Sequence, residues 1–489
     1  MLHLVNSHFR RYSLRSFISS LFLISLTYGN IYGNEPLELS VDDSPTKART
    51  SSGIYISWVE HIIDDPVTAA VAFNGSDGLV LGDLDLDGYE DIVSVHESDA
   101  EYDSSRHDPK FDPDLIGHVR IAFGSNDPSE WTNITLAEGA DVAAPEDASI
   151  ADINGDGFPD IMVAAELGHL IYFQNPREDI RKARWPRLIL PTTKGQGSYL
   201  RTFFADFDND GRPEATAANK GAQRPGPEDF MKSSPVSVFR VTGDPLDEKS
   251  WQENAIGLFS IPQNAEPVDL DGDGDLDIVV GSRGEQRIAW FENTEQHSGS
   301  FQEHAIGIAG ALVSGFNMVY ADINLDDRLD IIAGSDKGLV WLEQPQHIDS
   351  AWIPHIIGSF APDTITGIAI ADINGDGRLD IMAGGYSTGS RITEDQVDIN
   401  DPLGRLGWFE NGGPEKDWTR HDVSRRKRGM FDKFIARDLD KDGDIDFIGT
   451  RGNSGNLDGV FWIEQLRTNN PARAFTSSRI QDSQSMPLP

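Results

Sequence analysis

Short apolar runs recur at regular intervals along this chain and predict strands. Six of them follow directly after an acid, in DIVSV, DIMVA, DIVVG, DIIAG, DIMAG and DFIGT. Runs of this length are typical of buried strands. Each is followed by a second run that ends in an aromatic residue, as in RIAWFEN, and then by a short element that usually begins with Trp, such as Trp352 or Trp418. With the strand leading into the next acid, each unit is predicted to have four strands.

The acid before each run closes a nine-residue pattern that occurs seven times and is called here an acidic loop. The pattern is an acid, an apolar residue, Asp or Asn, any residue, Asp, usually Gly, two variable residues and an acid. Successive loops begin roughly 50 to 70 residues apart, which fits four strands with variable connections. Acidic loops 1 to 7 are Asp83 to Asp91, Asp152 to Asp160, Asp206 to Glu214, Asp269 to Asp277, Asp322 to Asp330, Asp372 to Asp380 and Asp438 to Asp446.

The spacing within a loop suits a hard cation. Side-chain oxygens at positions one, three, five and nine, with the backbone carbonyl of position seven, can converge on Ca²⁺, which takes six to eight oxygen ligands. The sequence therefore predicts up to seven structural calcium sites. The candidate ligands are Asp83, Asp85, Asp87, Tyr89, Asp91, Asp152, Asn154, Asp156, Phe158, Asp160, Asp206, Asp208, Asp210, Arg212, Glu214, Asp269, Asp271, Asp273, Asp275, Asp277, Asp322, Asn324, Asp326, Arg328, Asp330, Asp372, Asn374, Asp376, Arg378, Asp380, Asp438, Asp440, Asp442, Asp444 and Asp446.

Two other loop positions carry structural information. Position two is always Leu, Ile or Phe, so we expect it to face a core. Position six is Gly in every loop except the fifth, which has Asp327, and Gly permits the positive φ of a tight turn. Asp tolerates that conformation better than most residues, so the fifth site is expected to be weakened and not lost.

Two alternatives to this metal site were weighed. An EF-hand has flanking helices and a Glu at position twelve, where this chain has Ser94, Val163 or Val280. The second alternative is an acidic turn without a metal. Close carboxylates repel by about 4 kcal/mol per pair at an effective dielectric constant of about 20, which favours a bound cation.

The ends of the repeat predict how it closes. The last unit ends at Gln465 without its Trp-type strand, and Ser57 to Ile63 (SWVEHII) supplies such a strand at the other end of the chain. Pairing the two would leave no exposed sheet edge. We therefore predict an all-β fold, a seven-bladed β-propeller over residues 55–466 that is closed by an N-terminal strand joining the last blade.

The flanking segments and the composition limit the function classes. Arg10, Arg11 and Arg15 precede the apolar stretch Phe17 to Leu26, which predicts a signal peptide over 1–33 and a secreted or periplasmic protein; a buried helix is the alternative. The stretch is too short to span a membrane. A flexible linker is expected over 34–54 and a disordered tail over 467–489. The net charge of −39 disfavours nucleic-acid binding, and the lack of cysteine excludes disulfides and thiolate sites. We expect a monomer.

The acidic loops and the strands that follow them resemble FG-GAP or VCBS-type repeats, the units of integrin-like β-propellers and of many exported bacterial proteins. The resemblance covers about residues 55–466 and implies calcium binding, and such propellers include adhesion modules, carbohydrate-binding proteins and some sugar-active enzymes. The W-F-E-N and W-x-x-H strands are also similar to the propeller part of aldos-2-ulose dehydratase, a lyase that additionally carries cupin domains.

Three insertions suggest where a ligand binds. His96 to Gly117, Asn219 to Pro235 and Tyr386 to Gly404 all follow the strand after an acidic loop, so they should crown the opposite face around the axis. Cations also gather there, which suggests an anionic glycan. Pairing of these cations with Glu228, Asp229 or Glu394 is the alternative. The candidate ligand-binding residues are Lys194, Tyr199, Lys220, Arg283, Tyr386, Arg425, Arg426, Arg428, Lys433 and Arg451.

The histidines have two interpretations. Those of the W-x-x-H strands recur at equivalent positions, as do four tryptophans, and both sets are predicted to be packing residues: His61, His304, His355, His421, Trp290, Trp341, Trp408 and Trp462. The first insertion could bind Zn²⁺ or Mn²⁺, although a solvated loop or an extra calcium site is an alternative. Its candidate ligands are His96, Glu97, Asp103, His107, Asp108 and His118.

Three functions remain open. The preferred one is an exported calcium-binding module that recognises a glycan or protein ligand through its crown face. The second is a sugar-active lyase or dehydratase with its site on that face, using Tyr386, Tyr199, His96 or Lys220 as acid and base. The third is a structural scaffold. No H-E-x-x-H or P-loop pattern occurs, which disfavours zincin and nucleotide chemistry.

Overall fold

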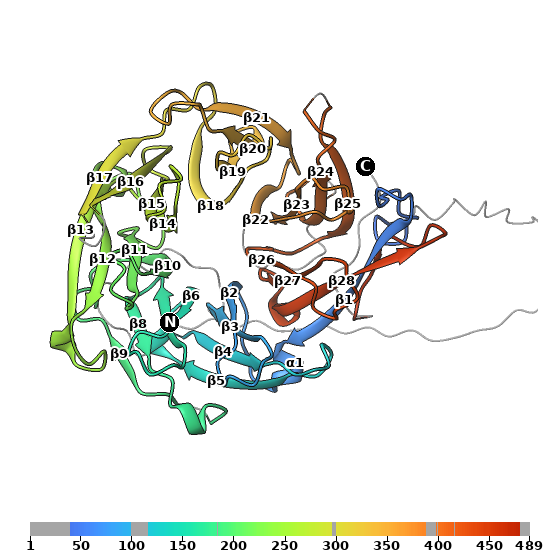
Figure 1. Cartoon of the computed structure of the whole chain (residues 1–489). Helices are drawn as coiled ribbons and strands as arrows, with labels where there is room; N and C mark the ends of the chain where they lie inside the picture. Colours follow the sequence, from blue (N-terminus) through green and yellow to red (C-terminus); the bar gives the residue numbers. More distant parts are fainter. Residues whose placement is uncertain are drawn as a thin grey trace, which may run out of the picture. The chain divides into compact units, whose positions relative to one another are not determined.

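Seven β-sheets surround a central axis in the computed structural model (Figure 1). The structure describes residues 40–98, 116–182, 184–295, 300–387, 398, 400–414 and 416–479. Six sheets have four strands and the seventh has five. The chain is thus a seven-bladed β-propeller, as predicted. The predicted signal peptide over 1–33 lies outside the described residues.

In six blades the strands follow chain order, from the axis outwards (Figure 1). Blades 1 to 3 consist of β2 (Ser76–Gly82), β3 (Asp91–His96), β4 (His118–Phe123) and β5 (Thr132–Glu138); β6 (Pro145–Ala151), β7 (Asp160–Ala165), β8 (Leu170–Phe173) and β9 (Arg187–Ile189); and β10 (Tyr199–Ala205), β11 (Glu214–Asn219), β12 (Ser234–Val241) and β13 (Trp251–Phe259). Blades 4 to 6 consist of β14 (Pro262–Val268), β15 (Asp277–Ser282), β16 (Arg287–Glu295) and β17 (Ser300–Ala305); β18 (Val313–Ala321), β19 (Asp330–Ser335), β20 (Gly338–Glu343) and β21 (Ile353–Gly358); and β22 (Thr364–Ala371), β23 (Asp380–Tyr386), β24 (Gly404–Glu410) and β25 (Thr419–Arg426).

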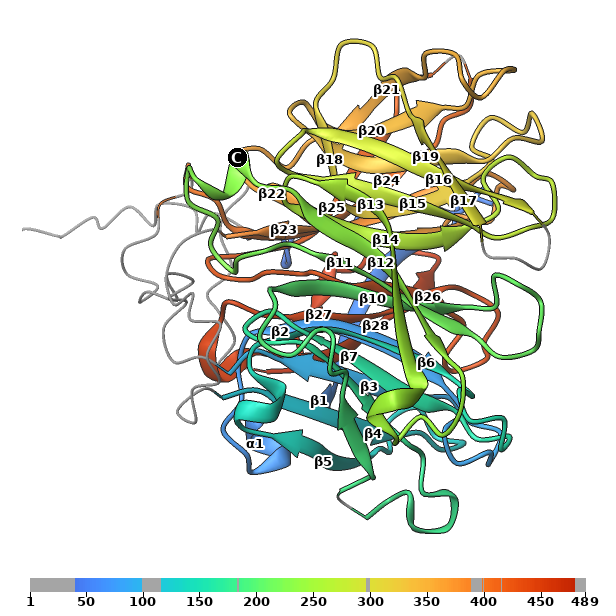
Figure 2. The same ribbon diagram turned by 90° about the vertical axis from the view of Figure 1, so that its left-hand side faces the viewer.

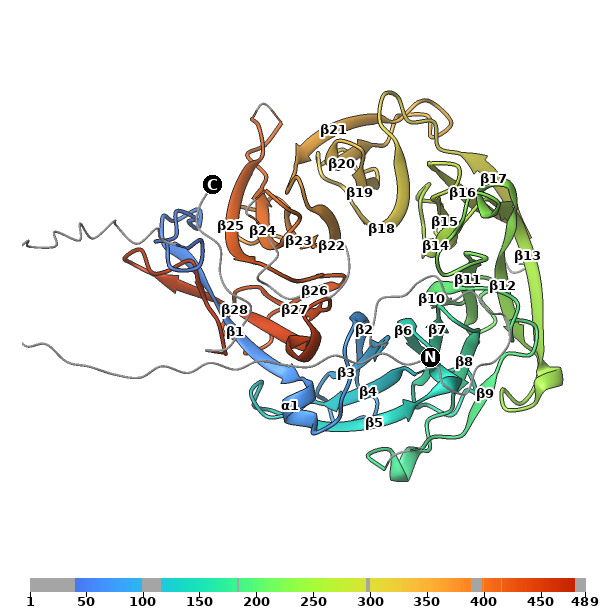
Figure 3. The same ribbon diagram turned by 180° about the vertical axis from the view of Figure 1, so that it is seen from behind.

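The seventh blade joins the two ends of the chain. Its strand order is β26 (Phe434–Arg437), β27 (Asp446–Arg451), β28 (Gly459–Thr468), β1 (Tyr55–Asp64) and β29 (Phe475–Thr476). In the antiparallel β1–β28 pair, Trp58 lies opposite Gln465 and His61 opposite Trp462. The blue β1 lies beside the red β28 from both sides of the ring (Figures 1 and 3). The predicted closure by an N-terminal strand is confirmed.

The segments next to this closure are packed on it. The N–H of Ala474 donates to the carbonyl of Ser44 at 2.8 Å, Asp42 pairs with Arg426 at 2.7 Å, and the ring of Phe475 is buried. Residues 40–54 and 467–479 therefore differ from the flexible linker and disordered tail predicted for 34–54 and 467–489. The physical reason is that β29 adds in parallel to the free edge of β1, so the terminal backbone groups find partners.

The strands run approximately along the axis, so their connections lie on two opposite faces (Figure 2). Each acidic loop joins the first strand of a blade to the second. Its position-two side chain packs between blades, as predicted: Leu84, Ile153, Phe207, Leu270, Ile323 and Ile373 are buried, and Leu439 is partly buried. The turns after the second strands lie on the other face, which is called here the crown face.

Helical structure is minor in the part of the chain that the structure describes. The helix α1 (Pro66–Ala69) is capped by the Asp65 side chain. Short 3-10 turns occur at Ala140–Val142, Arg177–Asp179, Asp229–Met231, Glu248–Ser250 and Gly455–Leu457. Within these described residues, no helix is long and apolar enough to cross a membrane.

Candidate calcium loops and axial cavity

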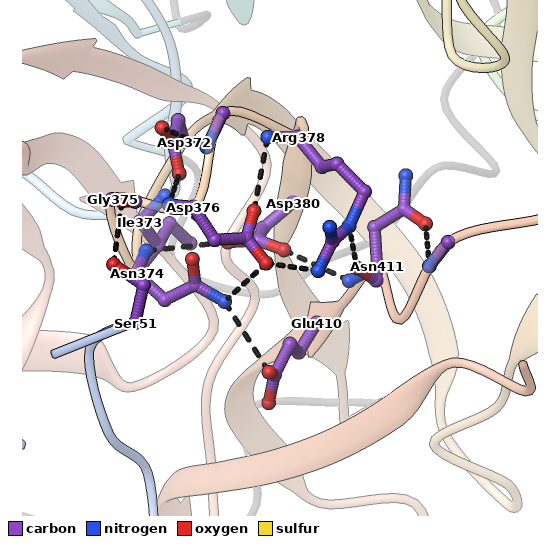
Figure 4. A network of polar contacts seen from close by, with 12 residues as sticks. Ser51, Asp372, Ile373, Asn374, Gly375, Asp376, Arg378, Asp380, Glu410 and Asn411 are labelled. Carbon is purple, nitrogen blue, oxygen red and sulfur yellow. Dashed lines mark hydrogen bonds and ion pairs between the residues drawn. The ribbon is translucent and has the colours of Figure 1, made fainter. Parts of the chain in front are cut away.

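Hydrogen bonds within the loop and to the rest of the blade shape the acidic loops, and loop 6 illustrates them (Figure 4). The position-one carboxylate of Asp372 accepts from the N–H groups of Asp376 at 3.0 Å and Gly377 at 2.9 Å. The closing carboxylate of Asp380 accepts from the N–H of Ile373 at 3.1 Å. It also accepts from the N–H of Asn411, which follows the third strand β24, at 2.8 Å. The loop is therefore tied both to itself and to its blade.

Two positions of the loop have positive φ. Position six has it throughout, including Asp327 at 63°, as the sequence predicted. Position four has it as well, at Leu86, Gly155, Asn209, Gly272, Leu325, Gly375 and Lys441. The sequence interpretation missed position four because it treated that position as free. The Gly in three of the seven copies was the available signal.

The closing acids are buried, and burial disfavours their charged form. Burial raises the pKa of Asp91, Asp277, Asp380 and Asp446 to about 7, although backbone N–H donors oppose the shift. Neighbouring loop aspartates, such as Asp85 and Asp87 beside Asp91, raise it further. A bound cation would favour the ionised form at these positions.

The acidic loops fall into two classes. Loops 1, 3, 4 and 7 have Asp at position three, and in each of them three carboxylates offer oxygens within 4.8 Å of one another. Loops 2, 5 and 6 have Asn there. Its Nδ2 donates to the position-five Asp, at 2.8 Å from Asn154, 2.9 Å from Asn324 and 3.4 Å from Asn374.

The loops fit a hard cation in composition and geometry. Their donors are all oxygens, which Ca²⁺ prefers. The Oδ1 atoms of Asp85, Asn374 and Asp444 are buried and have no hydrogen-bond partner among the described residues. Buried polar atoms normally have a partner, so a cation is a suitable one. The predicted ligand set therefore remains a proposal that the geometry fits.

Arginines approach several loops, which the sequence interpretation did not foresee. Arg181 contacts Asp85 at 2.7 Å, Arg177 contacts Asp156 at 2.8 Å, and Arg467 contacts Asp444 at 3.4 Å. The position-seven side chains Arg328 and Arg378 fold back onto the position-five aspartates of their own loops. Position seven was expected to contribute only its backbone oxygen.

A cavity of about 1290 Å³ lies at the crown end of the axis. Its wall is strongly polar. Blades 1 and 2 contribute Asp77, Glu97, Glu146 and Glu166, and blades 3 to 5 contribute Lys220, Arg224, Arg283 and Lys337. Arg224, Arg283 and Lys337 are exposed, whereas the four acids and Lys220 are buried. Lys220 contacts the carboxylate of Glu166 and donates to the carbonyl of Gln223 at 2.8 Å.

The carboxylates on this wall affect one another. Asp77, Glu97 and Glu146 offer oxygens within 4.8 Å of one another. Burial raises the pKa of Glu146 well above its usual range, and the charges of Glu166 and Glu97 raise it further. Gln223 also lines the cavity, and neither polar atom of its side chain has a hydrogen-bond partner in the described part of the chain.

The candidate ligand-binding residues do not all reach this cavity. Lys220, Arg283 and Tyr386 line it. Lys194, which is exposed, and Lys433, which is half-buried, are not part of the cavity lining. The others are buried away from the lining: Tyr199, Arg425, Arg426, Arg428 and Arg451. Arg425 and Arg426 end the outermost strand of blade 6, which explains their distance from the axis.

The histidines of the first insertion have polar partners other than a metal. His96 bonds to Ser76 Oγ at 2.7 Å and Ser94 Oγ at 3.1 Å, and His118 bonds to Ser98 Oγ at 2.6 Å. Burial lowers the pKa of both histidines. Asp103, His107 and Asp108 lie outside the described residues, as does Glu394.

Comparison with known proteins identifies the repeat. Residues 152–215, 269–333 and 322–383 match the FG-GAP-like repeat. A comparison with curated proteins finds no match. Among solved structures, the chain is similar to YCF48 from Cyanidioschyzon merolae, at 9% identity, a TM-score of 0.44 and coverage of 83% of this chain and 98% of that one. It is also similar to Bacillus licheniformis rhamnogalacturonan lyase PL11, at 13% identity, a TM-score of 0.43 and coverage of 90% and 76%. The protein is therefore a seven-bladed β-propeller that carries FG-GAP-like repeats.

Proposed function

We propose that this protein is a calcium-stabilised binding module that holds an anionic, hydroxyl-rich ligand, such as a uronate-bearing glycan, in its axial cavity. The observation that carries this proposal is the division of the cavity wall into a cationic side and an acidic side. Calcium in the acidic loops would stabilise the ring. Since calcium is abundant outside cells, the same loops support the predicted export.

The cationic side of the cavity suits a carboxylate or sulfate. Arg224 and Arg283 are exposed and form no ion pair with any described residue, and the ammonium group of Lys337 bonds only to the carbonyl of Gly310 among them. Charge-assisted hydrogen bonds from such groups are stronger than neutral ones, and arginine can bind a carboxylate through two bonds. Three blades therefore present cations to one ligand.

The acidic side suits hydroxyl groups. Glu146, Glu166 and the side chain of Gln223 can accept hydrogen bonds from a sugar ring held by the cations opposite. Three further acids line the cavity, and each has a partner. Asp336 and Asp363 bond within their own blades, to the N–H of Leu312 at 2.8 Å and to Arg405 respectively, and Asp432 pairs with Arg201 of blade 3 at 2.6 Å. The volume of about 1290 Å³ is larger than a typical site for a small ligand, which favours an oligosaccharide.

A glycan array followed by calorimetry tests the proposal. We expect binding to polymers that contain uronate or sulfate, and a loss of at least about 1000-fold in affinity in Arg224→Ala/Arg283→Ala/Lys337→Ala, because each of the three charge-assisted bonds contributes about 1.5–3 kcal/mol and about 1.4 kcal/mol is a factor of ten. The matched control, Lys182→Ala/Lys249→Ala/Arg437→Ala, removes the same charge elsewhere and should bind normally. Equal losses of affinity in both variants would mean that only the net charge of the protein matters. A wild type that binds no anionic glycan on the array would refute the proposal.

A lyase or dehydratase is the second candidate function. Of its four candidate acid and base groups, only Lys220 and Tyr386 line the cavity. Lys220 is buried against Glu166, and such a pair can exchange a proton with a bound sugar. Mass spectrometry of the glycans after incubation distinguishes the two functions. New unsaturated products that vanish in Lys220→Ala would favour the enzyme, whereas intact glycans would favour binding alone.

A further inference from the structure

Four blades carry the same three side chains beside the acidic loop. A Glu on the third strand bonds through Oε2 to the Nε2 of a His on the neighbouring strand, at 2.7 to 2.8 Å. The His ring stacks on a Trp of the third strand, with ring centroids 4.3 to 4.8 Å apart. The sets are Glu292, His304 and Trp290; Glu343, His355 and Trp341; Glu410, His421 and Trp408; and Glu464, His61 and Trp462.

The other oxygen of the glutamate faces position three of the acidic loop. In blade 6, Glu410 Oε1 accepts from Asn374 Nδ2 at 3.3 Å, and in blade 5, Glu343 Oε1 accepts from Asn324 Nδ2 at 3.4 Å. In blades 4 and 7, where position three is Asp271 or Asp440, the equivalent Glu292 or Glu464 is close enough to interact with it electrostatically. One carboxylate thus links a packed His–Trp pair to the loop.

This link fixes the direction of the Asn374 amide. The nitrogen points toward Glu410, and the amide oxygen points away from it (Figure 4). That oxygen, on a residue only 2% exposed, is the one with no hydrogen-bond partner among the described residues. The equivalent oxygen of Asn324 in loop 5 accepts from the N–H of Asp326 at 3.1 Å and is held in place within its loop. An amide held by its nitrogen keeps its oxygen available to a cation, whereas a free amide can rotate and present its N–H groups.

We propose that Glu343 and Glu410 are positioning residues for cation binding in acidic loops 5 and 6. Each holds the position-three Asn by its nitrogen, and each is itself held by a histidine stacked on a tryptophan. Residues that orient ligands in this way commonly change metal affinity by about 10- to 100-fold when mutated. The inference rests on the proposed calcium binding and adds residues outside the nine-residue pattern.

Blade 2 provides an internal comparison. Its loop also has Asn at position three, Asn154, but Gln174 precedes the residue that bonds the closing acid, where blades 5 and 6 have Glu. The outer strand of blade 2 also lacks the His: Leu188 lies opposite Tyr172, where blades 5 and 6 place a His opposite a Trp, so Gln174 has no histidine to hold it toward Asn154. Arg177 bonds to Asp156 of that loop instead. The inference therefore applies to loops 5 and 6 and leaves loop 2 unaffected.

Native mass spectrometry of the full chain at graded calcium concentrations tests the inference by counting bound ions. In Glu343→Met/Glu410→Met, two ions should require at least about 10-fold more calcium than in the wild type. Glu343→Gln/Glu410→Gln keeps a carbonyl that can accept from Asn, so it should recover most of the affinity. The control is Glu248→Met, because Glu248 is exposed and its side chain bonds to no acidic loop among the described residues. It should leave the number of bound ions at each calcium concentration unchanged.

The outcomes separate this inference from the calcium proposal. Retention of every ion in the Met pair at wild-type calcium concentrations would overturn the positioning role alone, and so would equal losses in the Met and Gln pairs. A wild type that binds no ions would overturn both. If the Met pair does not fold at saturating calcium, the double variant His355→Phe/His421→Phe tests the positioning role in its place. It keeps the stacking but loses the bond to Glu, and should still weaken two sites.

Discussion

Acidic loops 4 and 6 share one sequence pattern but differ in how their charges are balanced. Loop 4 has Asp at positions one, three, five, seven and nine, and no Lys or Arg pairs with these residues within the described ranges. In loop 6, Asn374 replaces one carboxylate, Arg378 contacts Asp376, and Glu410 holds the Asn (Figure 4). Loop 4 resembles a site that needs a cation, whereas loop 6 has donors of its own.

This difference shows that a repeated motif can have two energetic roles. In loop 6 the amide and guanidinium donors hold the carboxylates in place before any ion arrives, so a bound ion adds to an organised loop. In loop 4 the carboxylates repel one another by about 1 to 4 kcal/mol per close pair, depending on exposure, until a cation binds. Calcium should therefore matter most where the loop is most acidic.

Removal of calcium should have the largest effect on stability, and it tests this contrast between the loops. Each site held at one hundred times its dissociation constant contributes about 2.7 kcal/mol, so several sites together reach the roughly 5–15 kcal/mol stability of a typical domain. We expect EDTA to lower the melting temperature sharply. In hydrogen exchange, loops 4 and 7 should lose protection before loops 5 and 6. Simultaneous loss in all loops would remove the distinction, and an unchanged melting curve in calcium-free protein would contradict the stabilising role.

Exchanging position three tests the comparison directly. In EDTA, Asp271→Asn should raise the stability of the protein by up to about 1 kcal/mol, because it removes one repelling charge, and Asn374→Asp should lower it by a similar amount. In calcium the order should reverse, since each added carboxylate strengthens the site. Calorimetric melting of both variants with and without calcium checks this. Shifts of the same sign under both conditions would mean that position three acts through folding alone.

The sequence predicted the parts of this molecule that depend on local spacing. The seven loops, the positive φ at position six and the closure through Trp58 follow from residues that are close in sequence or repeat at fixed offsets. The axial cavity could not be predicted in the same way. Arg425 and Arg426 were assigned to the crown by chain order, but they end an outer strand, whereas Glu146 and Glu166 meet Lys220 across two blades.

The pH dependence of stability should invert with calcium. Burial raises the pKa of the closing acids to about 6 for Asp160 and Asp330 and about 7 for Asp277, above the value of about 4 in an unfolded chain. The folded state then binds more protons than the unfolded state between these values, so the stability of calcium-free protein falls as the pH rises from about 4 through about 7.

Melting curves at about pH 5 and about pH 8 check this direction. In EDTA the protein should be more stable at the lower pH. With calcium the trend should weaken or reverse, because the ion binds the ionised carboxylates. Asp277→Asn should reduce the slope in EDTA. A calcium-free protein that gains stability toward about pH 8 would show that other groups control its titration.

The smallest expected effect concerns position four, where every loop has a positive φ but only three have Gly. Leu325 has a φ of 62° and is 73% exposed. It therefore bears conformational strain, and truncating its side chain removes little packing. A left-handed conformation costs a non-Gly residue about 1–2 kcal/mol, part of which the greater flexibility of unfolded Gly offsets. Leu325→Gly should therefore stabilise the protein by about 0.5–1 kcal/mol.

The reciprocal Gly155→Leu should destabilise the protein. An added Cβ meets no atom within 4 Å, but Gly155 has a φ of 72°, which a Leu adopts only with strain. Denaturant melts in calcium measure both, and a stability loss in Leu325→Gly would mean that this exposed leucine makes a contact that outweighs the backbone strain.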